Sequence, residues 1–254
     1  MTTSPLPGYA ELHCLSNFSF LRGASHPEEL VARAQALGYA ALALTDDASL
    51  AGIVRAHVAA KACGLPLLVG AQFEVEAAEP GDACTLVVLA CHLDGYGNLC
   101  QFITRLRCGA AEKGRYRLTR DEVAGDALAG CVVLATPVRT ASAEQARTLA
   151  AWLQQHFAGR GWLMVTLLRQ LDDEHWLHTL REAGRASGVP LVAAGDVHLH
   201  VRSRKPLQDV LCAIRTGRPL ADCGLDLQPS AERHLRSRLR LARLYPAELL
   251  AETL

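Results

Sequence analysis

Seven runs of apolar residues recur along the chain, and each has the length of a buried strand. They are rich in Val, Leu and Ala, and they cover residues 10–13, 40–45, 66–72, 85–90, 131–136, 162–168 and 190–196. Continuous apolar runs of this length are typical of strands buried on both faces, as in a parallel sheet. The segments between them carry the spacing and the end signals of helices, so the pattern predicts repeated β–α units.

Glycines mark the ends of several predicted helices. The helices expected near 49–63 and 173–187 are followed by Gly64 and Gly188, and glycine is the preferred residue just after a helix C-terminus. Neither a G-x-G-x-x-G sequence nor a Walker loop follows a predicted strand, which disfavours the usual nucleotide-binding open sheets. We therefore predict an α/β fold in which seven βα units over residues 1–200 close into a barrel.

The alternation stops after His200. Residues 201–254 are predicted to form helices and loops interrupted by prolines, and they resemble the start of another module. The last residues, from Pro246 onward, have the pattern of a helix that continues to the end of the sequence. We expect the chain to be part of a longer protein.

Composition narrows the class of protein. Half of the residues are hydrophobic and the formal net charge is zero, so a packed core is expected and disorder is not. The apolar runs are too short to cross a bilayer, and the N-terminus lacks the features of a signal peptide. Nine cysteines without a Cys-x-x-Cys pair argue against a disulfide framework or a zinc knuckle. A cytoplasmic protein without a membrane partner is the prediction.

Although the net charge is zero, basic and acidic residues are unevenly distributed along the chain. Residues 1–199 hold 16 basic and 20 acidic side chains, whereas residues 200–254 hold 10 basic and 6 acidic ones. Five arginines account for half of the basic residues in the tail: Arg233, Arg236, Arg238, Arg240 and Arg243. Two interpretations stay open, contact with nucleic-acid phosphates or a solvated helix face.

Polar residues with metal-binding side chains follow three of the predicted strands. His13 stands at the end of the first, Asp46 and Asp47 follow the second, and Asp196 and His198 stand at and just after the end of the seventh. The carboxyl ends of barrel strands meet at one mouth, where such residues can bind a divalent metal that activates water for phosphoester hydrolysis. The alternative is that Asp46 caps the next helix and that His198 is an ordinary loop residue.

Five ordered motifs make the resemblance to a known family specific. The run from Tyr9 to Gly23 resembles the opening motif of PHP (polymerase and histidinol phosphatase) domains in bacterial C-family DNA polymerases. Later motifs of those domains resemble residues 42–47, 69–72, 95–99 and 194–198. Residues 201–215, 232–236 and 244–250 are similar to the error-prone, damage-inducible branch of the family. The resemblance implies a distorted seven-stranded (βα) barrel of PHP type, followed by a short, mainly helical segment.

The family's metal site is only partly present. His13, Asp46, Asp196 and His198 match family ligands, and they are the candidate metal residues. Other ligand positions have changed, to Leu15, Asp47, Gln72, Thr85 and Pro137. Leucine and proline offer no side-chain donor atom, and a glutamine is a weaker ligand than a carboxylate. We therefore predict a vestigial site that holds no ion, or one weakly bound zinc or manganese ion.

The resemblance implies a longer parent protein that is a DNA-directed DNA polymerase using magnesium and acting in DNA replication, repair and translesion synthesis. Its active site lies outside this segment, for which we expect a structural or docking role. Expected partners are the rest of the polymerase chain, DNA through the parent, a sliding clamp and mutagenesis accessory proteins. Two alternatives remain: an active metal-dependent phosphoesterase or 3′–5′ exonuclease, and a free-standing interaction module.

Overall fold

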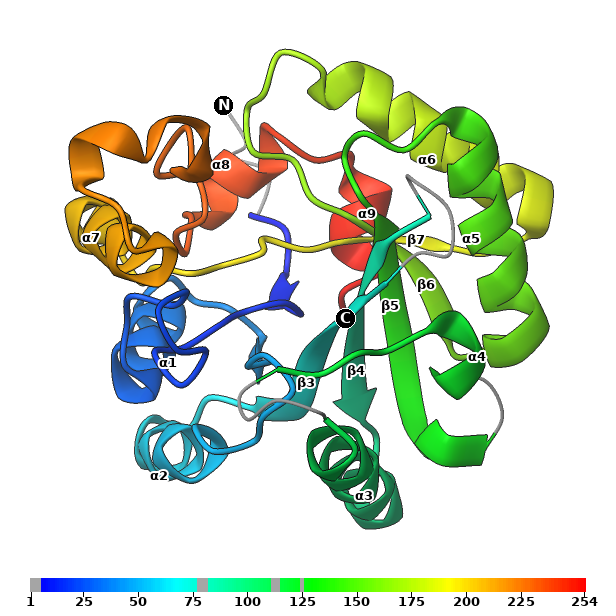
Figure 1. The fold of residues 1–254 in the computed structure, drawn as a ribbon, viewed down its shortest axis with the longest axis horizontal. Coiled ribbons are helices and arrows are strands. Elements are labelled where there is room, and N and C mark those ends of the chain that lie inside the picture. Colours follow the sequence, from blue (N-terminus) through cyan, green and yellow to red (C-terminus); the bar gives the residue numbers. More distant parts are fainter. Residues whose placement is uncertain (1–5, 77–81, 111–114, 124–125) are drawn as a thin grey trace. The chain divides into compact units, whose positions relative to one another are not determined.

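The computed structural model describes residues 6–76, 82–110, 115–123 and 126–254. Within them, seven strands follow one another through a sheet in chain order, β1 to β7 (Figure 1). The strands are β1 (Ala10–Glu11), β2 (Ala41–Leu44), β3 (Leu67–Val75), β4 (Cys84–Ala90), β5 (Cys131–Pro137), β6 (Gly161–Val165) and β7 (Leu191–Ala193). Each lies in or across one of the seven apolar runs, so the prediction of seven strands and of the α/β class is confirmed.

The sheet is mixed, and the prediction of parallel strands throughout is wrong at β4. Strands β1 and β2 pair in parallel, as do β5 and β6, but β4 is antiparallel to both β3 and β5. Only residues 76–83 separate β3 from β4. A parallel neighbour needs a crossover of about a dozen residues or more, whereas an antiparallel one needs only a short connection.

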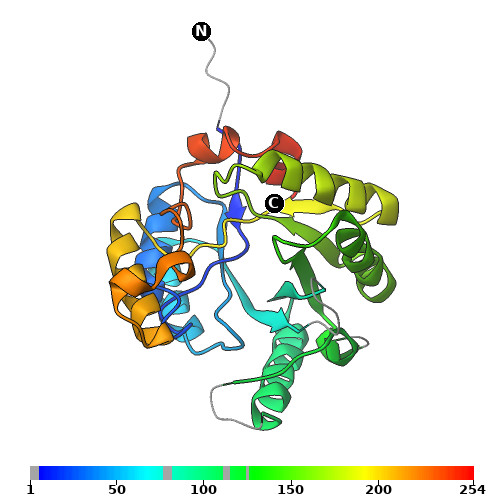
Figure 2. The same cartoon turned by 45° about the horizontal axis from the view of Figure 1, so that its top comes forward.

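The chain divides into two compact units. Unit 1 consists of residues 1–68, 166–170 and 193–254. Its helices are α1 (Pro27–Ala36), α2 (Ile53–Cys63), η2 (Arg202–Arg204), α7 (Lys205–Thr216), η3 (Leu220–Asp222), η4 (Gly224–Asp226), α8 (Arg238–Ala242) and α9 (Ala247–Ala251). Helix α2 ends at Gly64 in the left-handed conformation, as predicted. Figure 2 shows α7, in yellow to orange, beside α1, in blue. Residues 201–254 are therefore packed in the same unit as β1 and β2.

Unit 2 consists of residues 69–165 and 171–192. It contains α3 (Leu93–Cys108), α4 (Arg120–Val123), η1 (Asp126–Leu128), α5 (Ala143–Phe157) and α6 (Asp173–Ser187). Helices α5 and α6 lie side by side (Figure 1), and α5 also packs on β5 and β6. Strand β4 supplies fully buried Leu86, Val87 and Val88 to the core. Helix α6 ends at Gly188 in the left-handed conformation, again as predicted.

Among the described residues, no helix combines the length and the apolar character that crossing a membrane requires.

Candidate metal centre

The candidate site lies in unit 1, where the segments after β1, β2 and β7 run beside one another. Cys14 is central to this arrangement, because its carbonyl accepts a hydrogen bond from the Thr45 backbone N–H at 2.8 Å. Cys14 also forms an isolated parallel bridge with Val197. The backbone thus brings His13, Asp46 and the 196–198 segment to one end of the unit, as the strand-end pattern predicts.

Two of the other three candidate residues, His13 and His198, lie around Asp196. Its Oδ1 is 3.0 Å from His198 Nε2 and 3.8 Å from His13 Nδ1. Asp196 has a φ of +46°, a left-handed conformation that is uncommon for residues other than glycine. This backbone turn fixes the direction of the carboxylate toward the two imidazoles.

The Asp46 carboxylate accepts hydrogen bonds from hydroxyl and backbone N–H donors. Its Oδ1 accepts hydrogen bonds from the Ser16 N–H at 2.8 Å and the Ser19 hydroxyl at 2.7 Å, and its Oδ2 accepts the Ser16 hydroxyl at 2.7 Å. A Cβ at Gly52 would lie 2.8 Å from Oδ2, so that side of the carboxylate is also closed. Burial raises the pKa of Asp46. The geometry makes Asp46 the anchor of the 16–19 loop.

The polar atoms of His198 are likewise engaged. Its Nε2 faces Asp196, and its Nδ1 lies 3.1 Å from the Gln208 Nε2, which can only donate. This pairing assigns a neutral imidazole with its proton on Nε2. Burial is the main cause that lowers the pKa of His198 to about 4, and the charges of Arg22 and Arg215 act in the same direction. Neither ring nitrogen offers a lone pair to a cation in this arrangement.

The second oxygen of Asp196 forms an ion pair with Arg233. The Arg233 Nη1 contacts Asp196 Oδ2, and both side chains are mostly buried. A divalent ion at Asp196 would stand next to this guanidinium and would be repelled by it. Among the described residues, no group of three or more His, Cys, Asp or Glu side chains is arranged to hold a metal ion. The residues present therefore do not fit the metal that the sequence motif implies.

The five positions at which the resemblance implies changed ligands lie in both units. Leu15 is buried in unit 1. The backbone N–H of Asp47 donates to the Ser19 hydroxyl at 2.9 Å. Gln72, Thr85 and Pro137 belong to strands of unit 2, where Gln72 on β3 is buried and pairs with Val87.

The five arginines of the tail do not form one exposed cluster. Arg236 is 1% exposed, and Arg233 contacts Asp196. Arg240 donates to Glu232 at 2.6 Å. The Arg238 guanidinium lies over Gly38, and Arg243 is exposed. The buried position of Arg236 removes it from any surface that could contact a nucleic acid.

A buried polar network beside the site was not evident from the sequence. Glu11, 1% exposed, accepts hydrogen bonds from the backbone N–H groups of His13 at 3.1 Å and Gly195 at 2.7 Å, and from the Tyr9 hydroxyl at 2.9 Å. A Cβ at Gly195 would lie 2.3 Å from Glu11 Oε2, so glycine is needed there. Glu11 thus joins the residues next to two candidate ligands. A charged residue within an apolar run is the one sequence signal that indicates it.

Arg236 forms the other half of this network. Its Nη1 donates to the Leu167 carbonyl at 2.8 Å, and its Nη2 lies 3.3 Å from the Tyr245 hydroxyl. The Tyr245 hydroxyl in turn donates to the Ala194 carbonyl at 2.8 Å. Burial raises the pKa of Glu11, while the positive charge of Arg236 lowers it. The network therefore balances one buried negative charge with one buried positive charge.

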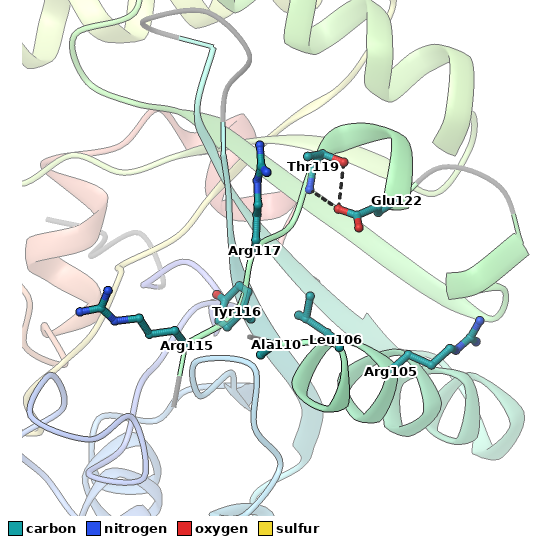
Figure 3. A pocket seen from close by; sticks show the side chains of 9 residues that line it. Arg105, Leu106, Ala110, Arg115, Tyr116, Arg117, Thr119 and Glu122 are labelled. Carbon is teal, nitrogen blue, oxygen red and sulfur yellow. Dashed lines mark hydrogen bonds between the residues drawn. The ribbon is translucent and has the colours of Figure 1, made fainter. Parts of the chain in front are cut away.

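Unit 2 contains a separate, open hollow of about 770 Å³ (Figure 3). Arg105, Arg115 and Arg117 line it, but their side chains point in three different directions. Arg117 is bound to Glu76 at 2.9 Å, and Glu122 accepts from Thr119. Divergent guanidinium groups do not make a site for a single anion, so the candidate centre remains the one around Asp196.

Two solved structures have a similar fold. A "putative metal-dependent phosphoesterase" from Bifidobacterium adolescentis is 19% identical with a TM-score of 0.55, over 77% of this chain and 89% of that chain. An amidohydrolase from Chromobacterium violaceum, with bound sulfate and no metal, is 20% identical with a TM-score of 0.59, over 75% and 88%. At this identity the likeness concerns the fold.

The sequence model of the PHP domain matches residues 11–164, and the chain belongs to the PHP domain family. Its relatives include proteins named error-prone DNA polymerase from Bordetella parapertussis, 52% identical, and from Dechloromonas aromatica, 53% identical. Each match covers 98% of this chain and 24% of the relative. The chain thus spans about a quarter of the length of these polymerases.

Proposed function

We propose that this chain is the PHP domain of an error-prone, damage-tolerant DNA-directed DNA polymerase, and that it acts as a structural and docking domain with a degenerate metal site. Residues 1–200 correspond to the barrel, and residues 201–254 lead into the following module. The observation that carries the proposal is the ion pair of Arg233 with Asp196, because it places a fixed positive charge where a catalytic metal would be needed.

The activity of the longer protein is part of this proposal. Relatives at 52–53% identity carry the name error-prone DNA polymerase, which supports nucleotidyl transfer on DNA. Magnesium as its cofactor belongs to the same proposal. The palm that would hold magnesium lies outside this segment. Repair and translesion synthesis, a cytoplasmic location, and binding to a sliding clamp and accessory proteins follow from the same assignment. The nearest partner is the remainder of the polymerase chain.

A second function, metal-dependent phosphoester or 3′–5′ exonucleolytic hydrolysis, is favoured by one observation. His13, Asp196 and His198 still lie together, and one structural neighbour carries the name of a metal-dependent phosphoesterase. Against it stand the saturated Asp46, the neutral His198 and the ion pair of Arg233. None of these groups is free to activate a water molecule as the structure stands.

Elemental analysis of the chelator-treated chain after incubation with zinc and manganese decides between the two. The structural role predicts less than about 0.1 ion per chain, since a site without free anionic ligands binds weakly. It also predicts no hydrolysis of bis-p-nitrophenyl phosphate or of 3′-labelled single-stranded DNA. Two or more tightly bound ions, with hydrolysis that His13→Ala abolishes, would establish the second function instead.

A further inference from the structure

The backbone around Arg233 is fixed against the end of the 196–200 segment. The Arg233 carbonyl accepts hydrogen bonds from the N–H groups of His198 at 2.8 Å and Leu199 at 3.0 Å. On the other side, the Leu235 N–H donates to the Leu199 carbonyl at 3.1 Å, and Leu199 forms a parallel bridge with His234. This double attachment holds the start of the Arg233 side chain next to the candidate centre.

The Arg233 side chain is directed by two partners. Its Nε donates to the Gln228 Oε1 at 3.0 Å, and its Nη1 contacts Asp196 Oδ2. An arginine guanidinium keeps its charge at neutral pH, and this one has a carboxylate in contact with it. The arginine therefore enters the site as a permanent cation.

Arg233 is also the cation that contacts the Asp196 carboxylate. His198, on the other oxygen, has its Nδ1 3.1 Å from the Gln208 Nε2, which only donates, so the hydrogen-bond pattern assigns it a neutral imidazole. His13 lies farther away, at 3.8 Å. A carboxylate that is removed from water needs a compensating charge, because an unpaired buried anion is strongly unfavourable. Arg233 supplies that charge from residues 231–236 of the same chain.

We propose that Arg233 is a built-in cation that supplies to Asp196 the positive charge a divalent ion would otherwise supply, and that it thereby excludes such an ion from the centre. The inference rests on the proposed degenerate metal site and names what keeps that site closed. It also gives residues 231–236 a role. They cover the segment that follows β7 through the ion pair of Arg233 with Asp196 and the backbone hydrogen bonds to His198 and Leu199.

Zinc uptake by Arg233→Gln tests the proposal. Glutamine has a shorter side chain that stays polar but carries no charge, so the Asp196 carboxylate loses its counter-cation and can bind one ion on the side of Oδ2. We expect equilibrium dialysis of the chelator-treated variant to give about one zinc ion per chain, against less than about 0.1 for the unchanged chain. Arg233→Lys, which retains the charge, and Arg243→Gln, an exposed site in the same segment, should both bind as little zinc as the unchanged chain.

The Asp196→Asn/Arg233→Gln double variant separates charge pairing from general damage to the fold. It should lose the zinc gained by Arg233→Gln, because the carboxylate ligand is gone. If the single variant unfolds at a lower urea concentration than the unchanged chain, the double variant should regain a large part of that loss in the unfolding midpoint, since no unpaired carboxylate remains. A double variant as unstable as the single one would overturn the proposal.

The two proposals fail in different ways. If Arg233→Gln is folded and binds no more zinc than the unchanged chain, Arg233 is not the group that excludes the ion, and the inference is overturned while the degenerate site stands. If the unchanged chain itself binds one ion or more per chain, the degenerate site is disproved first.

Discussion

The two units of the chain are stabilised by different means. Unit 1 buries charged side chains, among them Glu11, Asp46 and Arg236, each 1% exposed. Unit 2 fills the centre of its sheet with apolar residues of β4 such as Leu86 and Val88, which are fully buried. In unit 1 the stability depends on a particular partner for each buried charge. In unit 2 it depends on how well the apolar side chains fit together in shape and volume.

This difference determines where substitutions act. In unit 1 the cost of a change comes from the partner that is left behind, because a buried group without its partner keeps the full cost of desolvation. In unit 2 the cost comes from atoms that no longer fit. The contrast therefore predicts charge- and pH-dependent effects in unit 1, and steric effects in unit 2.

The largest effect is expected for Arg236→Ala. The variant leaves Glu11 buried without its positive neighbour and removes the donors to Leu167 and Tyr245. Breaking a buried charge network from one side costs about 3–5 kcal/mol, and urea unfolding measures it. Arg243→Ala, at an exposed site in the same segment, should change stability by less than about 0.5 kcal/mol. Equal effects at the two sites would contradict the assignment of Arg236 to a buried network.

A steric effect of comparable size is expected in unit 2 for Gly95→Ala. A Cβ at Gly95, in the first turn of α3, would lie 2.0 Å from the Gly130 carbonyl oxygen, which is backbone and cannot easily move. We expect a loss of about 3 kcal/mol in urea unfolding. Gly97→Ala in the same helix has no atom within 4 Å of the new Cβ and should stabilise the protein by about 0.5–1 kcal/mol. If both variants are destabilised alike, the close approach is not the cause.

The sequence predicted the positions of strands and candidate ligands better than it predicted strand direction and the roles of the buried arginines. The seven strands followed from apolar runs, and the meeting of His13, Asp196 and His198 followed from their places at strand ends. The direction of β4 did not, because β3 extends to Val75 and leaves no room for a crossover helix. Arg233 and Arg236 stand in one arginine-rich segment, and no local pattern distinguishes an arginine bonded to a distant carbonyl from a solvated one. Tertiary contacts assign their roles.

The pH dependence of unit 1 provides a further test through His198. Burial lowers its pKa from 6.5 to about 4, so the stability it contributes is present above pH 6.5 and is lost as the pH falls toward 4. As the pH falls from 6.5 to 4, the free energy of unfolding should therefore decrease by about 2 kcal/mol less in His198→Gln than in the unchanged chain. Urea unfolding at a series of pH values measures the difference, with His57→Gln, on the exposed side of α2, as control. Parallel profiles for His198→Gln and the unchanged chain would refute the buried, neutral imidazole.

The smallest effect is expected for Asp46→Asn, and it separates the two aspartates of the candidate centre. Asp46 accepts hydrogen bonds from Ser16 and Ser19, and no ion pair found among the described residues involves it. Burial raises its pKa, so the protein loses stability as the pH rises from the ordinary pKa of an aspartate toward the raised pKa of Asp46. Asparagine keeps one acceptor and removes that charge. We expect a change within about 1 kcal/mol at pH 7, and a smaller loss of stability than in the unchanged chain between acid and neutral pH. Asp196→Asn, which leaves Arg233 without its counter-charge, should cost about 3 kcal/mol. If Asp46→Asn proves the more damaging of the two, the carboxylate of Asp46 has a charged partner, and the division of roles between the two aspartates is wrong.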